Sequence, residues 1–165
     1  MNHKFSLPAL CALVIFCTTL LPNATLAQSC TSCATMQAAA DRITQVAIQS
    51  TSDANYVANH SSGNGNANQF NQRLVRLGNA LLTIRTDLMQ INDLSIQGGF
   101  DGLQKESSEI MGAYQDAQSA YRAIDIQLSA GLPVPTQAAL DLRDAITALR
   151  DASPCIRREI QELDE

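Results

Sequence analysis

Between Phe70 and Ile96 the apolar residues form two parallel rows, and this pattern constrains the fold more than any other feature of the 165-residue chain. The second row repeats every seven residues, at Val75, Leu82, Met89 and Ile96. Together the rows predict a long helix that packs lengthwise against other helices, with an apolar face wide enough for about two or three neighbours. The first row is spaced alternately four and three residues apart and consists of Phe70, Leu74, Leu77, Leu81, Ile84, Leu88 and Ile91.

Polar residues and glycines predict the ends of this central helix. Asn66 followed three residues later by Gln69 is typical of a capping box, in which side chains satisfy the first free backbone N–H groups. Gly98 and Gly99 follow Gln97, and glycine is common just past the end of a helix. We therefore expect the helix to stop at Gln97.

Three further segments show the same helical spacing of apolar residues. The first starts at Ser29 or Ser32, has a row made largely of Ala and Ser, and ends at the Gly/Asn-rich connection 60–68. The second is capped by Asp101 and ends at a Gly/Pro-rich connection, after which Thr136 caps the last. Four helices of similar length with short connections predict an all-α, up-down-up-down four-helix bundle.

Ser153-Pro154 interrupts the last helical segment. A proline inside a helix removes one backbone hydrogen bond and clashes with the preceding turn, at a cost of about 3 kcal/mol. Serine followed by proline is also a common helix start. The last helix therefore either kinks at Pro154 or ends near Ala152, with a short fifth helix from Pro154 to Leu163.

The amino-terminal residues have the pattern of a secretory signal peptide. Lys4 precedes an apolar run from Leu7 to Leu21, and Ala27 provides a small residue for cleavage. We predict a signal peptide over 1–27 and a single helical domain over 28–165, exported to the periplasm or secreted. The domain has no second long apolar segment, so no membrane insertion of the mature chain is expected.

The charge of the chain argues against two classes of partner. The formal net charge is −5, and the longest basic run is Arg157-Arg158, with acidic residues close behind it. Nucleic acids and anionic membrane surfaces attract basic patches, so we expect neither as a partner. Most aspartates, Asp87 and Asp93 among them, fall off the apolar rows and are interpreted as a solvated face.

Three cysteines remain after signal cleavage: Cys30, Cys33 and Cys155. We favour a disulfide staple from Cys155 to Cys33 or Cys30, because the first and last helices run antiparallel and exported proteins keep disulfides. A local Cys30–Cys33 bridge is the alternative, and thiol-disulfide exchange by this pair is a further one. An odd cysteine also allows a disulfide-linked homodimer, beside a non-covalent one.

No cofactor or catalytic group is predicted. Covalent haem attachment needs a histidine directly after the second cysteine, where Ala34 stands, and the Glu-x-x-His pairs of di-metal bundles do not occur. His60 is the only histidine of the mature chain and falls in the Gly/Asn-rich connection. A single histidine in a loop offers no general base for a serine or cysteine nucleophile, so we expect no enzyme activity.

Two aromatic residues flank that connection. Tyr56 and Phe70 are interpreted as a contact site for a partner, with capping of the core as the alternative. By elimination the sequence favours an exported accessory protein that acts by protein-protein interaction, such as a chaperone-like, secretion-system or envelope component. The rival hypotheses are a thiol-redox or thiol-metal protein using Cys30 and Cys33, and an inhibitor or immunity protein for an exported partner.

Overall fold

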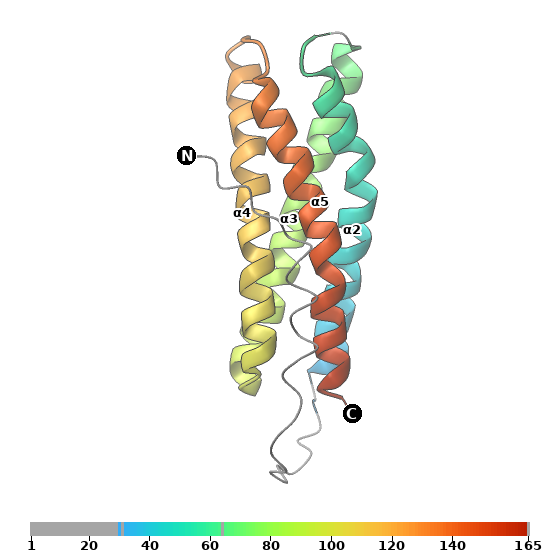
Figure 1. Ribbon diagram of the computed structural model, residues 1–165, viewed down its shortest axis with the longest axis vertical. Helices are drawn as coiled ribbons and strands as arrows, with labels where there is room; N and C mark the ends of the chain where they lie inside the picture. The colour runs from blue at the N-terminus through green and yellow to red at the C-terminus, as the bar shows by residue number, and fades with distance from the viewer. Residues whose placement is uncertain (1–29, 31, 64, 165) are drawn as a thin grey trace.

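Four long helices make up the fold in the computed structural model, which describes residues 30, 32–63 and 65–164. They are α2 (Cys33–His60), α3 (Ala67–Gly98), α4 (Asp101–Ser129) and α5 (Thr136–Glu162). The helices run alternately up and down along one long axis (Figure 1), and the described residues contain no strand. The all-α, up-down-up-down bundle is confirmed. The predicted signal peptide lies outside the described residues.

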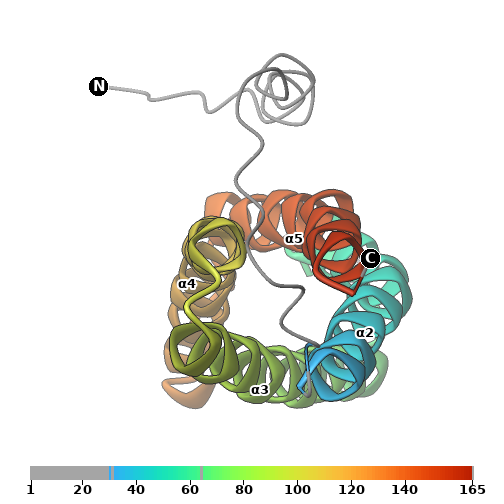
Figure 2. The ribbon, with the colours of Figure 1, turned by 90° about the horizontal axis from the view of Figure 1, so that it is seen from below.

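The helices form a closed ring around a shared apolar interior. The main contacts join α2 to α3, α3 to α4, α4 to α5 and α5 back to α2, and the end-on view in Figure 2 shows this order. The first described helix therefore packs against the last. This closure places the start of α2 beside the end of α5, as the carboxyl terminus in Figure 1 indicates.

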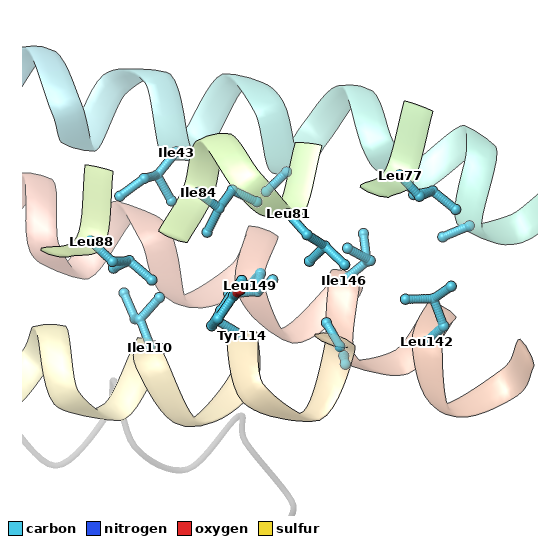
Figure 3. Packing of buried hydrophobic residues seen from close by; sticks show 14 of the residues in the cluster. Ile43, Leu77, Leu81, Ile84, Leu88, Ile110, Tyr114, Leu142, Ile146 and Leu149 are labelled. Carbon is cyan, nitrogen blue, oxygen red and sulfur yellow. The ribbon is translucent and has the colours of Figure 1, made fainter. Parts of the chain in front are cut away.

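The first apolar row of α3 lines this interior along its whole length. All seven residues are buried, from Phe70 with 6% of its surface exposed to Ile84 and Ile91 with none. In Figure 3, Leu81 and Leu88 of α3 point toward side chains of the other helices. The contribution of α2 consists mainly of small residues, as expected. The other labelled residues in that view are Leu77 and Ile84 of α3, Ile43 of α2, Ile110 and Tyr114 of α4, and Leu142, Ile146 and Leu149 of α5.

Only one of the predicted side-chain caps is confirmed. Asn66 Oδ1 accepts hydrogen bonds from the backbone N–H groups of Asn68 and Gln69, at 3.0 and 3.2 Å. Asp101 and Thr136 do not cap their helices, because each helix starts one residue earlier than predicted. They occupy the first helical position, and the residues before them, Phe100 and Pro135, carry no side chain that could cap.

Helix α5 continues through Pro154, so of the two predicted alternatives the end near Ala152 with a short fifth helix is wrong. The missing N–H of Pro154 would leave the carbonyl of Arg150 without its helical donor. Ser153 replaces that donor, because its Oγ lies 3.1 Å from the Arg150 oxygen and donates a hydrogen bond to it. Pro154 itself is exposed, so its ring meets no neighbouring helix. One serine therefore compensates for part of the cost of the proline.

The disulfide joins Cys30 to Cys33, with a Cα–Cα distance of 5.2 Å, and the favoured staple to Cys155 is wrong. The unbroken course of α5 explains the difference. Cys33 Sγ lies 3.9 Å from the carbonyl oxygen of Ile160, which places Ile160 beside Cys33. Cys155 is more than a turn away from Ile160, roughly 7 Å along the helix axis. That offset exceeds what a disulfide normally spans once the spacing between the helices is added.

Candidate functional site

The second apolar row of α3 is exposed, which makes it the most unusual surface of the described chain. Val75, Leu82, Met89 and Ile96 show 59%, 61%, 46% and 57% of their surface to solvent. The prediction that both rows pack against neighbouring helices is therefore wrong. Each of these residues directly follows a buried one, so its side chain is turned by about 100° away from the interior. We call these four residues the outer row.

The surface around the outer row is weakly charged. At about 100° per residue, Asn71, Asn79 and Thr86 fall on the same outer side of the helix, whereas Gly78 lies against Tyr121 of α4. The charged residues there are Arg85 and Asp93, which carry opposite signs and are both exposed. The outer row spans about 31 Å at 1.5 Å per residue. This side of α3 is therefore a long apolar strip without net charge.

The other large apolar residues exposed in the described chain do not form such a strip. Ile48 lies on α2, Ile126 on α4 and Leu132 in the connection between α4 and α5. Single exposed apolar residues are normal on protein surfaces, whereas a contiguous group marks a contact site. A repeat of exactly seven residues keeps one side of a helix against a partner helix in a left-handed coiled coil. The outer row thus supplies one of the two positions per heptad that contact a partner helix, and the other position is polar, at Asn79, Thr86 and Asp93.

Ion pairs link α2 to α3 on the side of α3 that faces away from the outer row. Arg42 donates two hydrogen bonds to the carboxylate of Asp87, at 3.1 and 2.7 Å. The Asp87 side chain is only 5% exposed, whereas that of Arg42 is half exposed. Asp87 therefore does not belong to a solvated face, contrary to the sequence interpretation. It places a carboxyl group in an interface to which α2 contributes mainly small side chains.

A second carboxylate links the same two helices near the other end. Asp53 accepts hydrogen bonds from Arg76 at 2.7 and 2.9 Å and from Arg73 at 3.0 Å. The hydrogen bond from Arg76, followed by the positive charges of both arginines, holds the pKa of Asp53 below its usual value, against the opposing effect of burial. Asp53 is thus ionised in the folded protein at neutral pH.

Tyr56 and Phe70 do not form an exposed aromatic pair. Phe70 is buried and packs into the apolar interior at that end, which is the capping role named as the alternative. The Tyr56 ring stacks on His60 at 4.0 Å and lies 4.4 Å from the Arg73 guanidinium. Its hydroxyl donates to Gln69 Oε1 at 3.0 Å. A partner contact at half-buried Tyr56 stays a prediction.

The cysteine pair lies at the start of α2. Cys33 is the first residue of the helix and is buried, with 4% of its surface exposed, whereas Cys30 is half-buried. The more accessible sulfur therefore belongs to Cys30. Cys155 takes no part in this disulfide.

A shallow groove of about 440 Å³ runs between α2 and α5. Arg157 reaches across it to Asp41, with an N–O distance of 3.2 Å. Ile48 is the one large apolar residue that lines it, and its two charged side chains already pair with each other. The remaining lining residues are Thr44, Gln45 and Gln49.

Comparisons of the chain with protein-family models, with curated proteins and with solved structures find no match. Within the described residues, no helix combines the length and apolar character that crossing a membrane requires. The same part of the chain brings no three His, Cys, Asp or Glu side chains together as metal ligands. The outer row, the ion pairs and the cysteine pair are thus the features from which a function is argued.

Proposed function

We propose that this protein is an exported helical bundle that acts by protein-protein interaction, with the outer face of α3 as its binding surface. The observation that carries the proposal is the outer row, four large apolar residues at heptad spacing that remain exposed. The signal-peptide pattern of residues 1–27 supports export. The surface fits one helix of a partner, packed lengthwise along α3.

The amount of exposed apolar surface suggests binding of modest strength. Covering a partly exposed Val, Leu, Met or Ile contributes about 1 kcal/mol per side chain. The row as a whole then provides several kcal/mol, from which the loss of translational and rotational freedom must be subtracted. Such a surface suits an accessory protein that binds reversibly, for example a chaperone-like, secretion-system or envelope component.

Chemical cross-linking in the envelope fraction of the source cells, followed by mass spectrometry, tests the proposal. Leu82→Asp places a charge in the middle of the outer row, so we expect it to abolish the cross-links that the wild-type protein makes through α3. Ile126→Asp is the matched control, because Ile126 is equally exposed but lies on α4. Cross-links that survive Leu82→Asp would contradict a binding role for this face. A stoichiometric exported enzyme as the partner would favour an inhibitor or immunity role.

Thiol-disulfide exchange is a second candidate, favoured by the unequal exposure of the bonded cysteines. A thiolate of a partner protein would attack Cys30 Sγ, breaking the bond to Cys33, whose thiolate leaves at the positive end of the α2 dipole and takes up a proton. The partner's second thiol would then displace Cys30, which leaves as a thiol. The partner dithiol is oxidised and the Cys30–Cys33 disulfide is reduced, with two electrons transferred.

Two measurements test this candidate. A loop this short contributes only about 2 kcal/mol of chain-entropy stabilisation, so reduction is expected to leave the bundle folded. Cys33→Ser, which leaves Cys30 as a thiol, is expected to accumulate a mixed disulfide with a protein from the envelope. A bridge that resists excess reduced glutathione in the folded protein, with no mixed disulfide in the variant, would exclude the candidate.

A further inference from the structure

We propose that the helix bound by the outer row is α3 of a second copy of this chain, packed antiparallel about a twofold axis at Met89. The inference rests on the proposed binding role of this face and names its partner. It follows from the order of residues along the outer side of α3, which is self-complementary about one point. The exposure of all four outer-row residues leaves that side accessible.

Residues of matching character lie at equal distances on both sides of Met89. Leu82 is two turns before it and Ile96 two turns after it, whereas Arg85 and Asp93 lie one turn before and one turn after. A twofold axis through Met89 therefore brings Leu82 of one copy to Ile96 of the other, and Met89 to its own equivalent. It also brings each Arg85 level with Asp93 of the second copy, so that two opposite-charge pairs form.

The charges exclude the parallel arrangement. In a parallel dimer every residue faces its own equivalent, so Arg85 would lie beside Arg85 and Asp93 beside Asp93. Like charges brought together at an interface cost free energy, and this cost is a common means of selecting one orientation. The antiparallel dimer converts both contacts into attractive ones.

The charges also select the register. An axis between Arg85 and Thr86 would cover all four apolar residues, including Val75 against Ile96. It would place the two Arg85 side chains side by side and set Asp93 against Gly78, where the Tyr121 hydroxyl of α4 lies. Asp93 lies close to the centre of the outer row, so it would lose its water for a neutral hydroxyl instead of the guanidinium of Arg85. Repulsion between the two arginines, together with this weaker partner for Asp93, outweighs the extra contacts of Val75.

The net charge of the chain does not oppose this contact. The chain is acidic overall, with a net charge of −5, and its copies repel one another at long range. The outer face of α3 carries one positive and one negative side chain, so it can meet a second copy without local repulsion. The apolar part of the interface consists of three contacts: Met89 with its equivalent, and Leu82 with Ile96 on either side. Such a small interface places the dimer among weak, reversible complexes. We expect association at roughly 10–500 µM, the range of weak protein-protein binding.

Sedimentation velocity of the purified protein over that concentration range tests the inference. The wild-type protein is expected to shift from the mass of one chain to that of two. Leu82→Asp is expected to remain a monomer at every concentration, whereas Ile126→Asp, on the exposed side of α4, dimerises as the wild type does. Circular dichroism verifies that the variants are folded. A wild-type monomer throughout the range, or a dimer indifferent to Leu82→Asp, would overturn the inference.

Charge reversal tests the antiparallel register. Arg85→Asp sets two acidic residues against each other, so we expect the dissociation constant to rise at least tenfold, and Asp93→Arg to have a similar effect. The double variant restores both pairs with reversed polarity and is expected to regain most of the affinity. If the double variant binds no better than the single ones, Arg85 does not face Asp93 and the register is wrong.

A cross-link locates the axis itself. Met89 lies on the twofold axis, so Met89→Cys in a Cys155→Ser background is expected to give a disulfide-linked dimer under mild oxidation. Leu82→Cys in the same background lies opposite Ile96 and is expected to stay monomeric on a non-reducing gel. Dimers from Leu82→Cys but not from Met89→Cys would overturn the proposed axis.

The outcomes separate this inference from the function on which it rests. A monomeric wild-type protein whose α3 cross-links in the envelope fraction are abolished by Leu82→Asp has the proposed binding role but a different partner, which overturns the inference alone. A protein that neither dimerises nor loses cross-links in this variant overturns both.

Discussion

The two apolar rows of α3 consist of similar residues at neighbouring positions, yet they have opposite environments. The inner row, which is the first row of the sequence (Phe70, Leu74, Leu77, Leu81, Ile84, Leu88 and Ile91), is covered by the three other helices. The outer row is roughly half exposed along its whole length. Because the two rows share one helix, differences between them reflect what covers each side rather than helix propensity.

This comparison teaches that one apolar pattern can serve two purposes. The alternating four-three spacing of the inner row follows the interior of the bundle, where neighbours lie on both sides. The strict seven-residue spacing of the outer row places one apolar side chain every two turns along a single line on the surface. The inner row therefore stabilises the monomer, and the outer row is available for a partner.

The largest expected difference between the rows concerns stability. Leu81→Ala removes a buried side chain and leaves a cavity, so we expect the free energy of unfolding to fall by about 2–5 kcal/mol. Leu82→Ala, one residue further along, removes an exposed side chain and should change it by less than about 0.5 kcal/mol. Urea unfolding of dilute protein measures both. Equal losses would show that the assignment of inner and outer sides is wrong.

Two aspartates of α3 extend the comparison to charged groups. Asp87 is buried against α2 and binds Arg42, whereas Asp93 is exposed on the outer face. Asp87→Asn weakens two charge-assisted hydrogen bonds in a buried setting, and we expect it to cost about 1–2 kcal/mol of unfolding free energy. Asp93→Asn serves as the matched control and should leave the unfolding of dilute protein unchanged. A larger loss in Asp93→Asn would contradict the account.

The pH dependence of stability tests the contribution of Asp53, the second carboxylate between α2 and α3. Asp53 has a lowered pKa in the folded protein, caused first by its hydrogen bond from Arg76. A lowered pKa contributes stability above the unfolded-state pKa, near 4, and that contribution is lost as the pH falls through the folded pKa. The difference in unfolding free energy between the wild type and Asp53→Asn should therefore shrink as the pH is lowered from 6 toward 2, in roughly unit steps.

The difference between the two proteins isolates Asp53 from other groups. Burial, with smaller effects from Glu109 and Glu159, raises the pKa of Glu106, whose contribution changes with pH in the opposite direction. That contribution is present in both proteins and cancels in the comparison. A difference that is constant with pH would show that the ion pairs of Asp53 do not stabilise the fold.

Oxidation of methionine gives the mildest comparison of the two environments. Met89 is 46% exposed in the outer row, whereas Met36 of α2 is fully buried. Dilute peroxide should convert Met89 to its sulfoxide well before Met36, because access to the sulfur controls the rate. Peptide mass spectrometry measures both rates in one sample. Comparable rates would indicate that Met36 becomes exposed in the folded protein or that Met89 is covered.

Much of the fold follows from residues that can be read directly. The inner row of α3, the Asn66 cap and Gly99, which adopts a left-handed φ of 68°, define the central helix and its ends. Apolar spacing also places the other helices correctly. The course of α5 through Pro154 could not be predicted, because it depends on a hydrogen bond from Ser153 to a carbonyl that only the folded helix presents.

The candidate site was harder to predict for a related reason. Hydrophobicity shows that Leu82 and Leu81 are both apolar, but not that the bundle closes around only one of them. A helical projection contains the missing signal, since every outer-row residue lies about 100° beyond a core residue. The pairing of the cysteines could not be predicted, because it depends on how far α5 is shifted along the bundle axis relative to α2. That shift places Ile160 rather than Cys155 beside Cys33. Sequence spacing does not determine this axial shift.

The thermal midpoint of unfolding at several protein concentrations tests the central claim most directly. If the inner row stabilises the monomer and the outer row binds a second copy, the midpoint of the wild type should rise with concentration. The midpoint of Leu82→Asp should equal that of the dilute wild type at every concentration, while Leu81→Ala should be lowered throughout. A wild-type midpoint independent of concentration across the range of expected association would contradict the account.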